Sequence, residues 1–525
     1  MSPISAELYP KTANEPKVHP LIKKSFVFVP SAGMRLAPEI LVLELMREVF
    51  FESHVGETIG TRDLNPDELD EERRPFFPKA ERAVLHALRG RRKKSKNAAT
   101  QRFFAPAYPQ LANRGWLGKN RERVVNNFLL SGPIAQHLWC RGVDSEDGKR
   151  RQGDLVEKIW RALLGNNSCL GQDVAGKELL AVALGPASFD ASGELPRRNL
   201  REKTGDPGSV IRIDDDELAN RIAEDLVAIC DLEAGLPRMQ WLQLLMTFLR
   251  YALPMWLLAQ MQVTRLLHRW LLEGMDHGCI ADAGVILCGI RSRNRGLLHP
   301  TLTPTRELFE HIERYMKCRV EMNILLYYLE MVRGDQLKGR TLNLSGGGRE
   351  VLGIDGLLTM AMNASGDVHR LESYVHIAAG LDVQTFLTRE GEQFSAWRNP
   401  LMSGQGKNID EFFRVLYRAE LGDEAGGYLI APEGRGSKRG FRVFPGQLLL
   451  KTMTYLAAKR KWSGQRRGGG GKLVLQDVED HFCQYGIDFS TAADARPLLM
   501  KELQAMGLLT GSPDAGSSVA VACPY

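Results

Sequence analysis

The stretch from Trp241 to Met261 reads WLQLLMTFLRYALPMWLLAQM, and it is almost wholly apolar. It is about as long as a membrane-spanning helix. However, Arg250 lies at its centre and Pro254 interrupts it. A central arginine is costly in a lipid bilayer, and a proline breaks or kinks a lone helix. We therefore expect a buried, kinked pair of helices at the hydrophobic centre of a helical domain, and no membrane span.

Helical patterns extend outward from this stretch in both directions. Residues 213–332 form the most helical part of the chain, and the acidic run Asp214 to Glu217 stands where it favours a helix N-terminus. Residues 124–184 and 351–421 also have helical patterns. The composition is 44% apolar and 25% charged, which excludes a collagenous, coiled-coil, mucin-like or wholly disordered chain. We expect a mainly α, multi-domain helical fold with small β elements.

The chain has 525 residues, which predicts about three or four domains at ~150 residues each. Shifts in composition and loops rich in Gly and Pro suggest the boundaries. The predicted organisation is an extended arm over 1–24, a mixed α/β region with a basic segment over 25–123, a helical region ending in a loop over 124–212, a central helical domain over 213–421, a basic loop over 422–440 and a final domain over 441–525.

The cysteines and the first residues predict the compartment. The eight cysteines are spread along the chain and form no CxxC pair. The first seven residues contain neither a basic region nor an apolar core, so they do not resemble a signal peptide. Both features favour a reducing, cytoplasmic location.

Positive charge is concentrated in two segments, although the net charge of the chain is only +6. Residues 89–123 carry a local charge of +10 and residues 434–472 carry +11. Their combined +21 exceeds the net charge, so the remaining chain carries −15. Dense Lys and Arg neutralise phosphates and release counterions, which predicts a nucleic-acid partner, most simply duplex DNA.

The two basic segments supply the candidate contacts with nucleic acid. In the second segment they are Arg435, Lys438, Arg439, Arg442, Lys459, Arg460, Lys461, Arg466, Arg467 and Lys472. In the first segment they are Arg91, Arg92, Lys93, Lys94, Lys96, Arg102, Arg114, Lys119 and Arg121, interleaved with aromatic residues that can stack on bases. The alternative is that both runs are solvated loop charges and that Phe103, Phe104 and Trp116 belong to a core.

The last 80 or so residues have the clearest order of elements. We predict helices over Gln447–Lys461, Leu475–Tyr485 and Arg496–Met506, with Gly507 as the C-terminal cap of the third helix. A β-hairpin is predicted from the segments 508–510 and 518–522, which flank a turn rich in Gly, Ser and Pro.

Three helices followed by a hairpin resemble a winged helix-turn-helix domain over residues 441–525. In that family the third helix enters the major groove and the wing contacts the DNA backbone. The resemblance implies that Arg496 and Lys501 contact DNA and that Gln504 can read adenine. The sequence departs from the pattern at the tip of the wing, which carries Asp514 and no base.

Known motifs for cofactors and metals are not met. The run Gly468 to Leu473 comes near a phosphate-binding loop, but it lacks the first glycine and the hydroxyl residue that would hold magnesium. His137 and Cys140 form one HxxC pair without a second pair nearby. We therefore expect no cofactor and no bound metal.

The general character of the chain, which is helical and poor in motifs, is similar to that of uncharacterised components of bacterial anti-phage defence systems. The sequence thus favours a non-catalytic, DNA-binding subunit of a bacterial multi-protein assembly that works with other protein subunits. Two alternatives stay open. One is a metal-dependent nuclease that uses Asp423 and Glu433, with Arg435 as the basic residue beside them. The other is a docking scaffold whose winged helix binds a protein.

Overall fold

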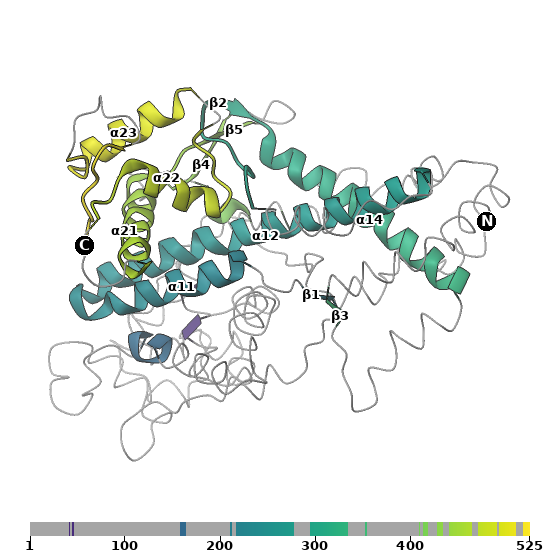
Figure 1. Ribbon diagram of the computed structural model, residues 1–525, viewed down its shortest axis with the longest axis horizontal. Helices are drawn as coiled ribbons and strands as arrows, with labels where there is room; N and C mark the ends of the chain where they lie inside the picture. The colour runs from purple at the N-terminus through teal and green to yellow at the C-terminus, as the bar shows by residue number, and fades with distance from the viewer. Residues whose placement is uncertain are drawn as a thin grey trace, which may run out of the picture.

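A computed structural model describes residues 41–42, 45–46, 158–163, 211–212, 217–277, 294–333, 352–353, 409, 413–417, 428–433, 440–464, 471–490, 493–510 and 518–525. These residues are mainly helical, with small β elements, as the sequence predicts (Figure 1). The helices are α11 (Glu217–Asp231), α12 (Arg238–His277), α14 (Glu307–Arg333), α21 (Gln447–Gly464), α22 (Leu475–Gln484) and α23 (Ala495–Ala505), with 3-10 turns η5 (Glu233–Gly235) and η7 (Arg414–Leu416).

The apolar stretch belongs to α12, which is a single helix of 40 residues with Pro254 inside it. The prediction of two helices separated near this proline is wrong. Tyr251 and Met255 on either side of the proline are fully buried, so packing holds the helix together although proline removes one backbone donor. The prediction of burial is confirmed. The helix is long and apolar enough to cross a membrane, but 89% of its most apolar window lies inside the protein.

Arg250, in the middle of that stretch, has a structural role. Its side chain is buried, and its guanidinium donates hydrogen bonds to the carbonyl oxygens of Val415 and Tyr417, at η7 and just after it. The guanidinium carbon lies 3.7 Å from the centre of the Tyr428 ring, a cation–π contact. Arg250, whose charge disfavours a membrane span, thus holds the segment around η7 against α12.

A three-stranded sheet connects the central region with the C-terminal region. Its strand order is β2 (Thr301–Thr305), β5 (Gly440–Val443) and β4 (Ile430–Glu433), and both pairings are antiparallel. A further parallel pair joins β1 (Ile211–Arg212) to β3 (Leu352–Gly353). The predicted boundary between residues 422–440 and residues 441–525 falls within β5, which pairs with β4.

The sequence predicts that residues 213–332 are helical, and this prediction is wrong at strand β2. The strand contains Pro304, which cannot donate to a sheet. It lies at the edge of the sheet, and its register with β5 shifts between Thr301 and Thr305. An edge position and an irregular register are the two conditions under which a strand accepts proline.

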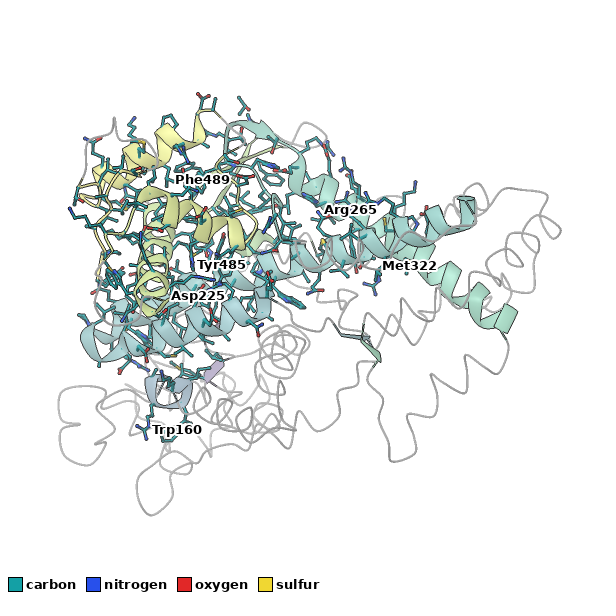
Figure 2. All side chains as sticks on the ribbon, viewed as in Figure 1. Trp160, Asp225, Arg265, Met322, Tyr485 and Phe489 are labelled. Atoms are coloured by element: carbon teal, nitrogen blue, oxygen red, sulfur yellow. The ribbon has the colours of Figure 1, made fainter. Side chains whose placement is uncertain are left out.

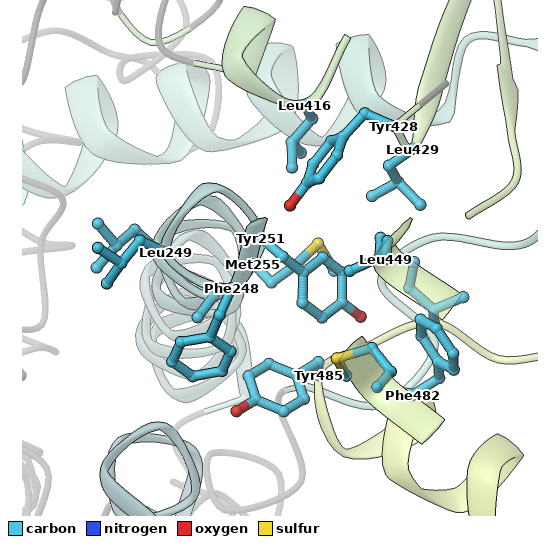
Figure 3. Packing of buried hydrophobic residues seen from close by; sticks show 14 of the residues in the cluster. Phe248, Leu249, Tyr251, Met255, Leu416, Tyr428, Leu429, Leu449, Phe482 and Tyr485 are labelled. Atoms are coloured by element: carbon cyan, nitrogen blue, oxygen red, sulfur yellow. The ribbon is translucent and has the colours of Figure 1, made fainter. Parts of the chain in front are cut away.

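One continuous hydrophobic core joins α11 and α12 to the C-terminal helices. Figure 3 shows Tyr251 and Met255 of α12 facing Phe482 and Tyr485. The rings of Tyr251 and Tyr485 are 5.3 Å apart, and those of Tyr251 and Phe482 are 6.2 Å apart in an edge-to-face arrangement. The described residues of the C-terminal region are therefore packed into the body of the protein.

A buried polar contact strengthens this packing. The hydroxyl of Tyr485 donates a hydrogen bond of 2.6 Å to Oδ2 of Asp225 on α11, and the two residues lie together in Figure 2. Nε2 of His481 lies 3.2 Å from the same carboxylate oxygen. Burial, followed by the nearby Asp225 charge, raises the pKa of Tyr485 well above its usual value, so the phenol keeps its proton. Two residues at the C-terminal end of α22 are thus linked to α11 through one carboxylate.

Gly486 forms the tight turn after this contact. Its φ is +101°, a region that L side chains rarely adopt. Its carbonyl oxygen accepts hydrogen bonds from the amides of Leu297 and Leu298, at 2.8 and 2.9 Å. A Cβ at this position would lie 2.6 Å from Leu297 and 2.7 Å from the carbonyl oxygen of Asn294. The close approach of these two segments therefore requires glycine.

The contact between α12 and α14 contains a second buried charge pair. Nε2 of His268 lies 2.5 Å from Oε2 of Glu321, and both side chains are buried. Burial alone would lower the pKa of His268, but the neighbouring Cys318 and Glu321 side chains outweigh it and raise the pKa to about 9. His268 therefore keeps its proton at neutral pH, and its contact with Glu321 joins the two longest described helices.

Candidate nucleic-acid interface

The C-terminal region is built from α21, α22 and α23 and from short paired segments between and after them. The predicted helices are confirmed, with ends that differ by at most a few residues. Gly507 ends α23 with a φ of +71°, and its amide donates to the carbonyl of Gln504. Leu509 bridges antiparallel to Val521, which agrees with the predicted hairpin.

A pairing that the sequence reading missed completes this arrangement. Val474, between α21 and α22, bridges antiparallel to Ala520. The amide of Leu475 donates to Val519, and the amide of Val521 donates to Leu473, both at 2.9 Å. The sequence offers one indication of this pairing, because the apolar residues Leu473 and Val474 stand together just before a helix. The segment before α22 thus pairs with the last segment of the chain.

Lys461 joins the end of α21 to the start of α22. Its ammonium lies 2.5 Å from Oδ2 of Asp477 and donates to the carbonyl of Lys472 at 2.8 Å. The Asp477 carboxylate also accepts the amide of Val474 at 2.8 Å, which satisfies an amide at the N-terminus of α22. Lys461, predicted as a DNA contact, is half-buried and engaged within the domain.

Arg496, the first predicted contact on the third helix, is also engaged within the domain. Its guanidinium forms two hydrogen bonds with the carboxylate of Glu479 on α22, one of them at 2.6 Å, and a third with Gln476 at 3.2 Å. The hydrogen bonds with Glu479 raise the pKa of Arg496 above its usual value. The buried Glu479 and this arginine set the packing of α23 against α22.

The outer face of α23 is formed by Pro497, Lys501, Gln504 and Ala505, which recur at helical spacing and are all exposed. Leu499 and Leu503 on the opposite face are buried in the core. Lys501 and Gln504, both predicted as DNA contacts, therefore lie together on the surface. The helix presents one fixed positive charge and one amide there.

Other predicted bases lie at the C-terminal end of α21 and near α22. Lys459, Arg460 and Lys472 are exposed. The guanidinium of Arg460 donates to Oε1 of Gln484 at 2.8 Å, and the ammonium of Lys459 is 5.7 Å from the centre of the Tyr455 ring. Arg442 is exposed on β5. These side chains lie at the surface of the C-terminal region.

Many predicted residues lie outside the described residues. Among them are the tip of the wing with Asp514, and Asp423 of the nuclease alternative. Glu433 is the last residue of β4, opposite Gly440. Within the described ranges, no three His, Cys, Asp or Glu side chains lie close enough to hold a metal ion. The predicted bases outside these ranges are Arg435, Lys438, Arg439, Arg466, Arg467 and the whole first set, Arg91, Arg92, Lys93, Lys94, Lys96, Arg102, Arg114, Lys119 and Arg121.

Comparisons with protein-family models, with curated proteins and with solved structures find no match to this chain. The geometry of the C-terminal region therefore carries the functional argument.

Proposed function

We propose that this protein binds duplex DNA through a winged helix-turn-helix domain formed by α21, α22, α23 and the segments that follow. In this proposal α23 faces the major groove, and the exposed bases near the end of α21 and on α23 contact phosphates. The protein acts as a non-catalytic subunit of a larger bacterial assembly, such as those of anti-phage defence.

The observation that carries the proposal is the order and pairing of the elements. Here Val474, between α21 and α22, pairs with Ala520, and Val521 pairs with Leu509. Three helices followed by paired segments thus support the resemblance that the sequence suggests, and the segment before α22 provides a further partner for the last segment.

The placement of charge also supports DNA as the partner. Arg496 and Lys461 are held by carboxylates within the domain, whereas Lys501, Lys472 and Lys459 are exposed. Exposed ammonium groups are available for phosphates, and each phosphate contact contributes through counterion release. With a single lysine on the outer face of α23, phosphate contacts are expected to outweigh base reading.

The test is a salt-dependent titration of labelled duplex DNA with the full-length protein. Point variants are preferable to truncation, because α22 packs on α12 and β5 pairs with β2. Lys501→Gln and Lys472→Gln should each reduce the slope of log K against log salt by about one. The matched control is Lys158→Gln, which removes an exposed lysine paired with Asp231 elsewhere on the molecule. The proposal is wrong if the wild type does not bind, or if all three variants keep its slope.

The same samples test the alternatives. Adding magnesium or manganese should leave the DNA intact. Cleavage that is lost in Glu433→Gln would favour the nuclease reading instead. A protein partner that is captured by the wild type in the absence of nucleic acid, and released by Lys501→Gln, would favour the docking scaffold.

A further inference from the structure

The contact between α12 and α14 brings a cysteine beside a histidine and a carboxylate. Nε2 of His268 on α12 lies 2.5 Å from Oε2 of Glu321 on α14. Cys318 is three positions before Glu321, so the two side chains lie on the same face of α14. Burial lowers the pKa of His268, and Cys318 together with Glu321 raises it more strongly, which places both side chains next to the ring. Cys318 is a free, half-buried cysteine.

Positive charge is close to this sulfur. His268 keeps its proton at neutral pH, because its pKa is raised to about 9. Burial and the neighbouring Arg314 lower the pKa of Arg265, and Cys318 opposes that shift, so the Arg265 guanidinium is a second cation near the thiol (Figure 2). A cation beside a half-exposed thiol favours the thiolate, which is the nucleophilic form of cysteine.

The other described cysteines have different surroundings. Burial raises the pKa of Cys230 and of Cys483, which favours the unreactive thiol at both positions. Cys523 donates a hydrogen bond of 3.2 Å to the carbonyl of Tyr525. Among the cysteines that the structure describes, Cys318 is the one that adjoins a protonated histidine.

A buried hydroxyl lies on the same side of α12 as His268. Thr264 is one helical turn before this histidine and is fully buried. Its Oγ1 has no hydrogen-bond partner within the described residues. A buried donor without an acceptor is costly, and an oxygen atom added to the sulfur on this side of α12 would supply an acceptor.

We propose that Cys318 is a site of reversible oxidation by a hydroperoxide, with His268 as the positioning residue that holds the thiolate. The sulfur attacks one oxygen of hydrogen peroxide, so an S–O bond forms and the O–O bond breaks. The leaving oxygen takes the proton of His268 and departs as water, and the imidazole regains a proton from solvent. Cys318 is thereby oxidised by two electrons to a sulfenic acid, and the peroxide is reduced by two.

A low-molecular-weight thiol reverses this oxidation in two steps. The first thiol attacks the sulfenic acid, forms a mixed disulfide with Cys318 and releases water. A second thiol then attacks the mixed disulfide and releases the Cys318 thiolate.

The test treats the full-length protein at pH 7 with hydrogen peroxide and dimedone, a diketone that traps sulfenic acids. Mass spectrometry of the digested protein follows the labelling of each cysteine with time. Cys318 should be labelled about tenfold faster than Cys483 and Cys523, because an ordinary thiol is only a few per cent thiolate at this pH. Dithiothreitol that is added after the peroxide and before the dimedone should prevent the label at Cys318.

Two variants test the role of His268. His268→Gln should slow the labelling of Cys318 about tenfold, and His268→Lys, which restores a cation, should recover part of the rate. Cys523 is the internal control, since its labelling rate should be the same in all three proteins. The inference is overturned if Cys318 in the wild type is labelled no faster than Cys523, or if His268→Gln leaves the rate at Cys318 unchanged. The first comparison uses the wild type, so it decides the matter even where a variant unfolds, and neither result bears on the proposed DNA binding.

Discussion

Removing the hydroxyl of Tyr485 should loosen the junction between α22 and α11. In Tyr485→Phe the carboxylate of Asp225 loses a buried donor at 2.6 Å. A hydrogen bond to a charged group contributes about 1.5–3 kcal/mol net, and phenylalanine fills nearly the same volume. We therefore expect the free energy of unfolding to fall by about 2 kcal/mol. The matched control is Tyr455→Phe, which removes a hydrogen bond of 3.1 Å to the neutral carbonyl of Ala228 and should cost about 1 kcal/mol.

A double-mutant cycle with Asp225→Asn isolates the pairwise contribution. Asp225 also lies 3.2 Å from His481, so Asp225→Asn should cost more than Tyr485→Phe alone. The assay is urea unfolding followed by tryptophan fluorescence, since the buried Trp241 and Trp256 of α12 report on this core. We expect a coupling energy of about 1–2 kcal/mol between the two substitutions. A coupling energy near zero would show that the hydroxyl and the carboxylate do not stabilise the junction together.

Three further predictions concern the core. Arg250→Met should lower the free energy of unfolding by about 3 kcal/mol, because two buried carbonyls lose a charged donor and one cation–π contact is lost; an unchanged urea midpoint would contradict this. Gly486→Ala should lower the free energy of unfolding by more than about 2 kcal/mol, because it forces an L side chain into a positive φ and into a clash with Leu297. It should also speed amide exchange at residues 297–298. The pKa of His268 is raised to about 9 from a usual 6.5, so its contribution to stability is complete below pH 6.5 and is lost as the pH rises through 9. The urea midpoint should accordingly decrease between pH 7 and 9 in the wild type, and His268→Gln should flatten that decrease.

Features that depend on near neighbours in the chain could be predicted from the sequence. Helix α11 begins at Glu217, at the end of the acidic run, because acidic side chains favour a helix N-terminus. Gly507 ends α23 because the turn requires a positive φ. The burial of Trp241–Met261 within the protein followed from the cost of placing Arg250 in lipid. The sequence also predicted the three C-terminal helices, although it missed the segment that pairs between the first two.

The continuation of helix α12 through Pro254 and the strand that contains Pro304 could not be predicted from near neighbours in the chain. Proline interrupts an isolated helix or strand, and each of these elements persists because of its surroundings. The buried neighbours of Pro254 support α12 on both sides of the proline. The edge position and shifted register of β2 accommodate Pro304.

Charge alone predicted a basic C-terminal region, and the tertiary structure decided which bases are available to a partner. Lys461 and Arg496 are held by Asp477 and Glu479, whereas Lys501 is exposed. Likewise, Tyr485 finds its carboxylate 260 positions away, and Arg250 finds its carbonyl acceptors more than 160 positions away. Helix periodicity and turn chemistry act over a few residues, so the sequence determined the elements by itself. Ion pairing and burial depend on groups brought together from distant parts of the chain, so only the folded protein determined the surface that they leave exposed.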